Sequence, residues 1–490
     1  MASRLVSPSS VGRFSRTFRF VFQKLSLLPN LSSFRRRLPF TVCSNRKLST
    51  PSARKVEVLR NPTFPYEQSA SRRPRELDFA HTLVQRGQFK EALGEIIIND
   101  KPKSLDQYIW AHLLRGISYE GLLDTSQALQ AYEIACEAAR KHSHVDPWLA
   151  IGCFRRYCET LHRMGSYDAL LQGKRTLVDL LRTFSQNDPA RYQLSLAEEL
   201  AGLATTHALY GAARDGLRAA EEAEEILNQI GMSTSISSPL LLWLKVIDTR
   251  SILHWALDEY ESAIRCNERS IEKYREIIEN GRKEGTVDPQ IEERYAIALG
   301  RFADQLRLML NQAPKILPLY RNALDVWMSL LKASPQVRRY AENIQIVAQR
   351  YSATELDKEK ANRVLRVVLD VVPDVFQDVR IALLLEMSEV SAEKPGAGEL
   401  EANRALRILD EWKGRTDSLP LKLRLAAATS LSNSLRRLDR DEEAVESMKA
   451  TEEKVEATLK VTPTLLDKSL SQDLVEFMVS SSRYVIVRKR

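Results

Sequence analysis

The pattern of apolar and small residues predicts paired helices over most of the chain. One stretch shows it clearly: Gly116 and Tyr119 lie three positions apart, and Ala128, Tyr132 and Ala135 follow at spacings of four and three. Residues three and four positions apart share one face of an α-helix. Small side chains on such a face let two helices cross closely, and aromatic ones fill the gaps between hairpins. The spacing therefore predicts helices that are each buried on one side.

The same features return along the chain at intervals of roughly one hairpin. If residues 92, 128, 170, 216, 263, 323, 361, 402 and 444 mark the second helices, the intervals are 36, 42, 46, 47, 60, 38, 41 and 42 residues. The interval of 60 contains a polar segment, residues 281–290, which we expect to form a loop between two sub-arrays. Repetition of this kind indicates a stacked array in which each unit packs on its neighbours.

These signatures resemble the tetratricopeptide repeat, in which Gly and Tyr mark the first helix and Ala, an aromatic residue and Ala mark the second. The resemblance covers residues 75–460; Trp110-x2-Leu113 matches the family's first-helix start but lies two residues out of register with Gly116. It implies an all-α superhelical solenoid of stacked antiparallel helix pairs, about eight to nine hairpins with long, kinesin-light-chain-like repeats. The alternative is an irregular helical bundle, because Ala and aromatic residues at helical spacing are common in any helical core.

The residues that we expect to pack the repeats together are small, aromatic or turn-forming. They are Gly87, Phe89, Ala92, Gly116, Tyr119, Ala128, Tyr132, Ala135, Tyr260, Ala263, Tyr320, Ala323, Trp327, Pro335, Ala361 and Pro373. Their predicted role is to hold helices together, and the sequence does not identify the residues that line a ligand groove.

The predicted organisation has six parts along the chain. They are a basic N-terminal targeting segment without fixed structure (1–56), a linker (57–74), an N-terminal repeat array (75–280), a loop (281–290), a C-terminal repeat array (291–465), and a capping helix with a basic tail (466–490).

Charge is divided unevenly between these parts. Residues 1–56 hold twelve of the 72 basic residues and no Asp or Glu, so that residues 57–490 hold 60 basic against 64 acidic residues. Binding to nucleic acid needs a surplus of cations that displace the counterions condensed on the phosphates. The repeat region as a whole lacks this surplus, so we expect no nucleic-acid partner for it.

The N-terminal segment has the Arg-rich, Ser-rich and acid-free composition of an organelle transit peptide. In a helix, Phe14, Phe18, Val21 and Leu25 would share one face. The bases that lie off this face are Arg13, Arg16, Arg19 and Lys24. Such a basic amphipathic helix is typical of proteins imported along an inside-negative membrane potential.

The expected location is the mitochondrial matrix. Residues 46–49 resemble the pattern of the matrix protease, which would cut after Leu48. The alternatives are a plastid, which the Met-Ala start and the Ser-rich opening favour, and the cytoplasm, where the segment would be a basic tail. No run of 18 apolar residues is present, so we expect no transmembrane helix.

Motifs for catalysis and for metal binding give no site. The sequence has no P-loop, no HExxH and no GxSxG. Cys153, Cys158 and His162 are the best metal candidates, but Cys153 and Cys158 would lie about 140° apart around one helix. We therefore expect no enzyme activity, no catalytic residue, no metal, no cofactor and no small-molecule substrate. The acidic run 221–225 is interpreted as a solvent-exposed helix face.

The resemblance implies a binding function. In the family, the first helices line a concave groove that binds extended peptides or partner helices, and some members clamp a carboxylate with Lys and Asn. The matching positions in the clearest unit are Leu113 and Ile117, so we expect an apolar groove without the clamp. The main hypothesis is a non-catalytic scaffold, assembly factor or adaptor that binds other proteins through the concave groove. The alternative is a helical-repeat RNA-binding factor of organellar gene expression, which needs a basic stripe.

Overall fold

The structure is a computed structural model. It describes residues 74–98, 104–142, 145–210, 212–231, 238–285, 287–309, 313–391, 397–412, 418–462, 465, 470–474 and 477. The predicted targeting segment and most of the predicted C-terminal tail lie outside these residues. Every regular element among the described residues is a helix, which confirms the all-α fold. Within this part of the chain, no helix combines the length and the apolar composition needed to cross a bilayer.

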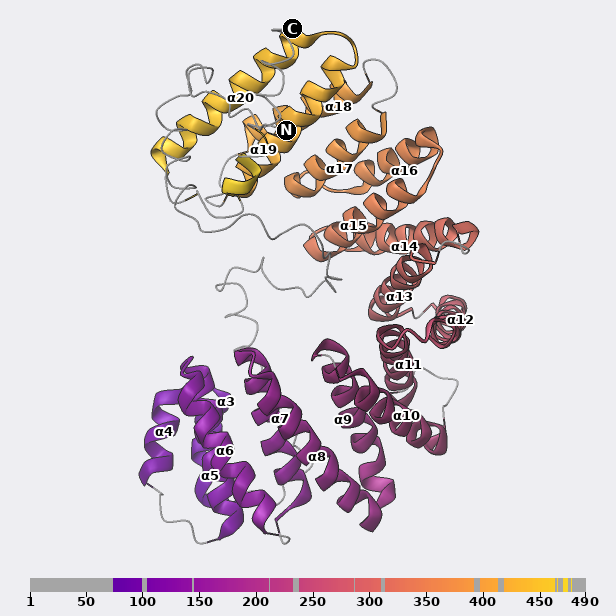
Figure 1. The fold of residues 1–490 in the computed structure, drawn as a ribbon. Coiled ribbons are helices and arrows are strands. Elements are labelled where there is room, and N and C mark those ends of the chain that lie inside the picture. Colours follow the sequence, from indigo (N-terminus) through magenta and orange to yellow (C-terminus); the bar gives the residue numbers. More distant parts are fainter. Residues whose placement is uncertain are drawn as a thin grey trace, which may run out of the picture. The chain divides into compact units, whose positions relative to one another are not determined.

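The helices form two compact units, and the division between them falls between Ile277 and Ile278, inside α12. The N-terminal unit contains a 3-10 helix (Arg75–Leu77), α3 (Asp78–Gln85), α4 (Phe89–Ile98), α5 (Leu105–Gly121), α6 (Thr125–Lys141), α7 (Pro147–Met164), α8 (Tyr167–Asn187), α9 (Pro189–Tyr210), α10 (Ala213–Ile230), α11 (Ser238–Ala256) and most of α12 (Tyr260–Glu284) (Figure 1). The C-terminal unit contains α13 (Pro289–Arg307), α14 (Ala313–Ala333), α15 (Arg338–Thr354), α16 (Lys358–Val371), α17 (Gln377–Val390), α18 (Ala397–Glu411), α19 (Leu419–Arg436) and α20 (Asp441–Val461).

Successive helices pair as hairpins, from α3–α4 through α19–α20, which makes nine hairpins in the described residues. In the pair α11–α12, Ser270 and Tyr274 of α12 donate hydrogen bonds to Asp248 of α11. The first helix of one hairpin also contacts the first helix of the next: α3 meets α5, α9 meets α11, α15 meets α17, and α17 meets α19. First helices such as α9 and α17 are therefore buried on several sides. Second helices such as α10 and α16 bury one face, as amphipathic helices do.

The nine positions that set the predicted repeat intervals all lie in second helices and are all buried. They are Ala92, Ala128, Leu170, Gly216, Ala263, Ala323, Ala361, Ala402 and Ala444. The long interval between Ala263 and Ala323 has a different cause from the one expected. Helix α12 runs to Glu284 and α13 begins at Pro289, so only residues 285–288 remain of the predicted loop 281–290.

The turns inside the hairpins share a left-handed backbone conformation. Gly87, Gly165, Asp258 and Asp439 have φ angles of 74°, 73°, 61° and 56°. Gly adopts this region at no steric cost, and Asp tolerates it better than most residues. Leu123 occupies the same turn position between α5 and α6 with a φ of 65°.

Glycines allow the closest approaches between helices. A Cβ atom on Gly116 would lie 2.3 Å from Cε1 of Tyr132, which is fully buried in α6. A Cβ atom on Gly121 would lie 2.3 Å from Cε2 of Phe89. Any side chain at these two positions would separate helices that now touch, because a packed interior has no room to absorb it.

The crossing at Gly116 gives a stability prediction. Gly116→Val should lower the free energy of unfolding by about 2 kcal/mol, because the added methyl groups overlap the Tyr132 ring. Gly94→Ala in α4 is the matched control, since a Cβ atom there would have no neighbour within 4 Å. That change should be neutral or stabilise by up to about 1 kcal/mol through helix propensity. Urea unfolding of the full chain, followed by circular dichroism, measures both; equal midpoints for the two variants would contradict the packing described.

Candidate protein-binding surface

Polar contacts join the first helices of the N-terminal unit. Glu120 of α5 accepts hydrogen bonds from the Thr160 hydroxyl of α7, at 2.6 Å, and from the Arg163 guanidinium. Arg155 of α7 donates from Nε to Glu199 of α9 at 2.7 Å. Each contact links residues about one repeat apart in sequence. They fix the register of neighbouring hairpins, so these charges hold the array together.

The expected apolar groove at Leu113 and Ile117 is wrong. Both side chains are buried in the core, at 0% and 4% exposure, because that face of α5 packs against its neighbours. The partly exposed side of α5 carries a different stripe at helical spacing: Tyr108, His112, Arg115 and Tyr119. The Tyr108 and His112 rings meet edge-on with their centroids 4.5 Å apart. The one repeat that matches the family well does not by itself show which face of α5 is buried and which is exposed.

The predicted packing residues differ in how far they are exposed to solvent and fall into three groups. The fully buried ones are Ala92, Gly116, Ala128, Tyr132, Ala135, Ala263, Tyr320, Ala323, Trp327 and Ala361. Those that are partly exposed are Phe89, Tyr119 and Pro373. The remaining residues, Gly87, Tyr260 and Pro335, are exposed at turns or helix starts.

Buried Tyr320 shows how a polar group is accommodated in the core of the C-terminal unit. Its hydroxyl donates to Asp304 of α13 at 2.6 Å. Burial, together with this hydrogen bond to a carboxylate, raises the pKa of Tyr320 well above its usual range. Asp304 also pairs with Arg350 of α15. One carboxylate thus connects three helices.

A groove in the C-terminal unit, with a volume of about 700 Å³, lies between α17, α19 and the C-terminal residues Asp473 and Phe477. Helix α19 supplies a stripe at spacings of three and four, which therefore shares one face. The stripe consists of Lys422, Ala426, Thr429, Asn433 and Arg437, all at least partly exposed. Glu389 also lines the groove, so both signs of charge are present.

The floor of this groove is fixed by small residues. Ser388 of α17 donates to the carbonyl oxygen of Gly398 in α18 at 2.7 Å and lies 2.8 Å from the hydroxyl of Ser430 in α19. A Cβ atom on Gly398 would lie 2.8 Å from the Ser388 carbonyl oxygen. Phe477 belongs to a buried cluster with Leu425. The stripe on α19 is therefore presented by a rigid, closely packed support.

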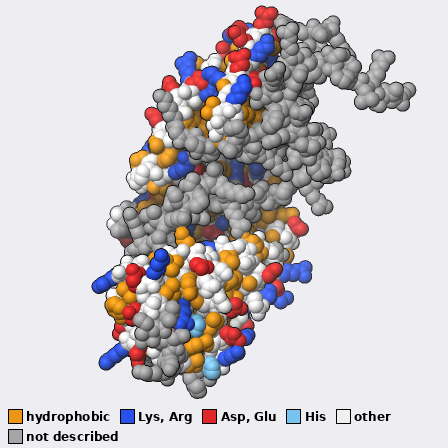
Figure 2. All heavy atoms as spheres, turned by 90° about the vertical axis from the view of Figure 1, so that its left-hand side faces the viewer, with side chains coloured by type: hydrophobic (Ala, Val, Ile, Leu, Met, Phe, Trp, Pro, Cys, Tyr) orange, Lys and Arg blue, Asp and Glu red, His pale blue; other side chains and the backbone are white. Residues whose placement is uncertain are grey.

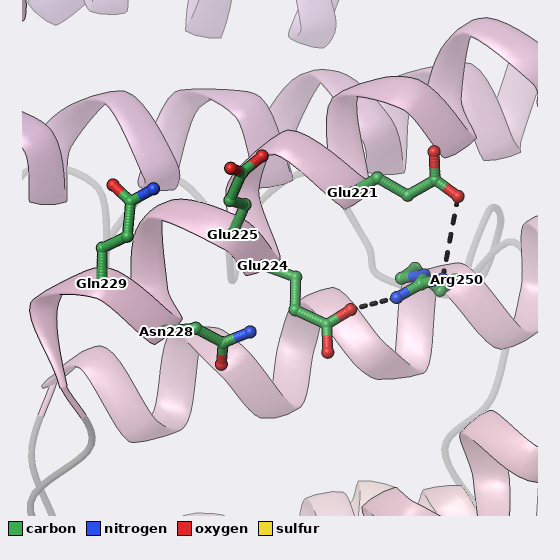
Figure 3. Close-up of a pocket in the computed structure, with 6 residues that line it drawn as sticks. All are labelled: Glu221, Glu224, Glu225, Asn228, Gln229 and Arg250. Atoms are coloured by element: carbon green, nitrogen blue, oxygen red, sulfur yellow. Dashed lines mark hydrogen bonds and ion pairs between the residues drawn. The ribbon is translucent and has the colours of Figure 1, made fainter.

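The interpretation of residues 221–225 as a solvated face is wrong at Glu224. Figure 3 shows Glu221 and Glu224 of α10 directed toward Arg250 of α11, in a cavity of about 430 Å³. The Glu224 side chain is 9% exposed and pairs with Arg250 and, at 3.0 Å, with Arg269 of α12. Glu225 is exposed, as expected. Within the acidic run, helical periodicity places Glu224 on a different face from Glu225. The sequence therefore contained a signal that Glu224 is directed inward.

The cysteines are packed as small apolar side chains. Cys153 and Cys158 are buried in α7, and burial raises the pKa of the Cys158 thiol to about 12 and that of Cys153 further. Such thiols are protonated and unreactive near neutral pH. His162 is exposed and lies apart from them. Among the residues that the structure describes, no three His, Cys, Asp or Glu side chains are placed to hold a metal ion.

A buried histidine lies under the second helices of the N-terminal unit. His207 of α9 is 2% exposed and lines a cavity of about 350 Å³ with Arg175 and Asp215. Burial lowers the pKa of His207, and Arg175 lowers it further, while Asp215 opposes them. The ring therefore takes up a proton less readily in the folded chain than in the unfolded chain.

Consecutive hairpins, close Gly and Ala crossings and left-handed turns define an all-α array of stacked antiparallel helix pairs. No family model matches the sequence, and no curated protein matches it. Several solved structures match at low identity.

The C-terminal part of a tetratricopeptide repeat-containing protein from Cytophaga hutchinsonii is 14% identical, with 60% of this chain and 95% of that chain covered and a TM-score of 0.38. The apo quorum sensor NprR from B. thuringiensis is 11% identical, with 77% and 97% covered and a TM-score of 0.38. A signal transduction ATPase with a tetratricopeptide repeat sensor from Pyrococcus horikoshii is 14% identical, with 78% and 55% covered and a TM-score of 0.40.

The buried carboxylate of Glu224 gives a second prediction. Glu224→Gln should lower the free energy of unfolding by about 3 kcal/mol, because it leaves the mostly buried Arg250 guanidinium with only the more distant carboxylate of Glu221, at 3.7 Å. Glu225→Gln is the control on the same turn and should change it by less than about 0.5 kcal/mol. Chemical unfolding of both variants tests this. If the Glu224→Gln protein is as stable as the control, the ion pairs of Glu224 do not contribute to the free energy of unfolding.

His207 gives a pH prediction. A histidine whose folded pKa is lowered takes up a proton more readily when unfolded, so its contribution to stability is present above about pH 6.5 and is lost as the pH falls. Between pH 7.5 and 5.5 the wild-type chain should therefore lose more stability than His207→Gln. Thermal unfolding of the two proteins at both pH values measures the difference. Parallel losses would mean that the pKa of His207 is not lowered in the folded chain.

Proposed function

We propose that this chain is a non-catalytic scaffold that binds partner proteins through the groove between α17 and α19. The observation that carries the proposal is the stripe of five partly exposed side chains on α19, which faces a cavity of about 700 Å³. The ion-paired carboxylates elsewhere, such as Glu120 and Glu224, are engaged in holding helices together. Their arrangement supports a structural rather than a chemical role.

The dimensions of the stripe fit an extended segment of a partner. Lys422 and Arg437 lie fifteen positions apart on α19, which is about 22 Å along a helix axis. An extended peptide covers this distance with about six or seven residues. Thr429 and Asn433 between them carry groups that can hydrogen-bond a peptide backbone, and the exposed Arg437 can attract a carboxylate near one end of the peptide.

We further propose that the protein acts as an assembly or adaptor factor in an organelle, most simply the mitochondrial matrix. The support is the acid-free, basic composition of residues 1–56, which lie outside the described residues. Import of the full chain into isolated mitochondria, with loss of the N-terminal segment after Leu48, is the expected result. A chain that stays outside and uncut, or that only plastids import, would remove this part of the proposal.

RNA binding is the alternative function. It calls for a continuous basic surface that neutralises successive phosphates. In the face of the N-terminal unit that Figure 2 presents, Lys and Arg side chains are interspersed with Asp, Glu and hydrophobic side chains. This mixture supports protein partners for that face.

The groove gives a binding prediction. In cells, a biotin ligase fused to the C-terminus of the chain labels neighbouring proteins. The double variant Asn433→Ala, Arg437→Glu should reduce the labelling of specific partners roughly tenfold, because hot-spot side chains carry most of the affinity of an interface. Both side chains are exposed, so the fold should be unchanged.

Lys449→Glu on the exposed side of α20 reverses a charge outside the groove and is the control. It should leave the labelled set intact. If the groove variant labels the same partners as the control, α19 is not the binding surface. If partners are lost only after ribonuclease treatment, RNA binding is favoured instead.

A further inference from the structure

Exposed apolar side chains lie at three neighbouring hairpin turns of the N-terminal unit. Leu123 is 58% exposed, Met164 47%, Leu209 49% and Leu122 36%. Each lies where the first helix of a hairpin ends, at α5, α7 or α9. We name these four residues the turn edge.

The three first helices lie side by side, with α7 in the middle. Ion pairs join α5 to α7 across 43 positions and α7 to α9 across 44 positions, through Glu120–Arg163 and Arg155–Glu199. Met164 lies 42 positions after Leu122 and 45 positions before Leu209. Because these separations nearly match those of the ion pairs, the three helices end within about 3 Å of one level along their axes. The turn edge is therefore one continuous row with the α7 turn at its centre.

Leu123 is an unusual residue for its position. Corresponding turns use Gly87, Gly165 and Asp258, which tolerate a positive φ, whereas Leu123 adopts 65° with a bulky side chain. Such a conformation costs energy, and its side chain gains little burial within the described unit in return. Strain combined with exposed apolar surface indicates that another molecule covers this side chain.

Opposite charges lie at the two ends of the row. Asp124 directly precedes α6, and Arg214 is the second residue of α10. Both side chains are exposed, and neither makes an ion pair with another described residue. The dipole of α10 disfavours a cation in its first turn, so Arg214 does not stabilise its own helix. The two charges occupy equivalent places, each at the start of the second helix of a hairpin.

The centre of the row carries both signs of charge. His162, Arg163 and Asp168 are exposed near the α7 turn, and Arg163 is engaged by Glu120. Along the row the charges are therefore negative at α5–α6, mixed at α7–α8 and positive at α9–α10. A row of this kind is complementary to its own reversed copy, which is what a two-fold interface requires.

We propose that the turn edge binds the turn edge of a second copy of this chain, through a two-fold axis that passes by the α7 turn. This axis places Leu122 and Leu123 of each copy against Leu209 of the other, and Met164 against its own counterpart. Asp124 of each copy then meets Arg214 of the other, so that an ion pair closes each end of the apolar strip.

The charges also select the direction in which the two rows run. If the rows ran parallel, Asp124 would meet Asp124 and Arg214 would meet Arg214, and like charges in an interface are unfavourable. The interface lies in the N-terminal unit, apart from the groove on α19, so a failure of either proposal leaves the other standing.

Sedimentation velocity of the purified full chain tests the proposal, because it measures mass against concentration. The wild-type chain should reach twice the monomer mass as its concentration rises. Asp124→Arg alone, or Arg214→Asp alone, places like charges at both ends of the strip and should weaken self-association at least tenfold. An equimolar mixture of these two variants restores opposite charges at both ends, so mixed dimers should form with nearly wild-type affinity. A fluorescent label on one variant identifies them.

The mixture also separates loss of charge pairing from loss of fold. Asp124 accepts a hydrogen bond from the Gln127 amide at the start of α6, so Asp124→Arg removes an N-cap as well as a charge. A variant that merely failed to fold would form no mixed dimers with Arg214→Asp. The double variant Asp124→Arg, Arg214→Asp should likewise dimerise by itself.

The apolar part of the interface has its own variant. Leu123→Asn should weaken self-association roughly tenfold, because apolar contact with the second copy is lost. Asn tolerates a positive φ, so its thermal midpoint in dilute, monomeric protein should equal or exceed that of the wild type. Leu356→Asn, at a 92% exposed position in the C-terminal unit, is the matched control and should dimerise as the wild type does. A wild-type chain that stays monomeric, single charge variants that dimerise normally, or a mixture without mixed dimers would each overturn the proposal.

Discussion

The structure depends on the close crossing of two helices within each hairpin and between hairpins. At Gly116 the Tyr132 ring occupies the space that a Cβ atom would need, and at Gly398 the backbone of Ser388 does the same. A single hairpin cannot cover both of its apolar faces, so stability arises only when neighbours stack. Small residues at the crossings make the stacking possible, and everything else in the fold is arranged around them.

Polar residues fix the register in which neighbouring hairpins pack against one another. Glu120, Ser388 and Asp304 each join helices of neighbouring hairpins through hydrogen bonds or ion pairs. Such contacts contribute modestly to stability where they are exposed, but they select one alignment of the repeats. With the register fixed, the outward side chains of α19 keep constant positions relative to α17, as a binding groove requires.

The fold could be predicted from the sequence further than the site could. Ala128, Ala361 and Ala444 marked second helices correctly because small buried residues recur with the helix pair. Leu113 and Glu224 were misplaced, since their burial depends on which neighbouring helix covers each face. The groove on α19 could not be predicted from the sequence, because polar residues at helical spacing look alike on an exposed and on a covered helix face. The strained turn at Leu123 could not be predicted either and is seen only in the structure.

Hydrogen exchange of the full chain, resolved along the sequence by mass spectrometry, tests the central claim most directly. First helices such as α9 and α17 are covered on several sides, whereas second helices such as α10 and α16 have one open face. The account predicts that protection alternates along the chain, with the first helix of each hairpin exchanging more slowly than the second. Uniform protection, or slower exchange in the second helices, would contradict it.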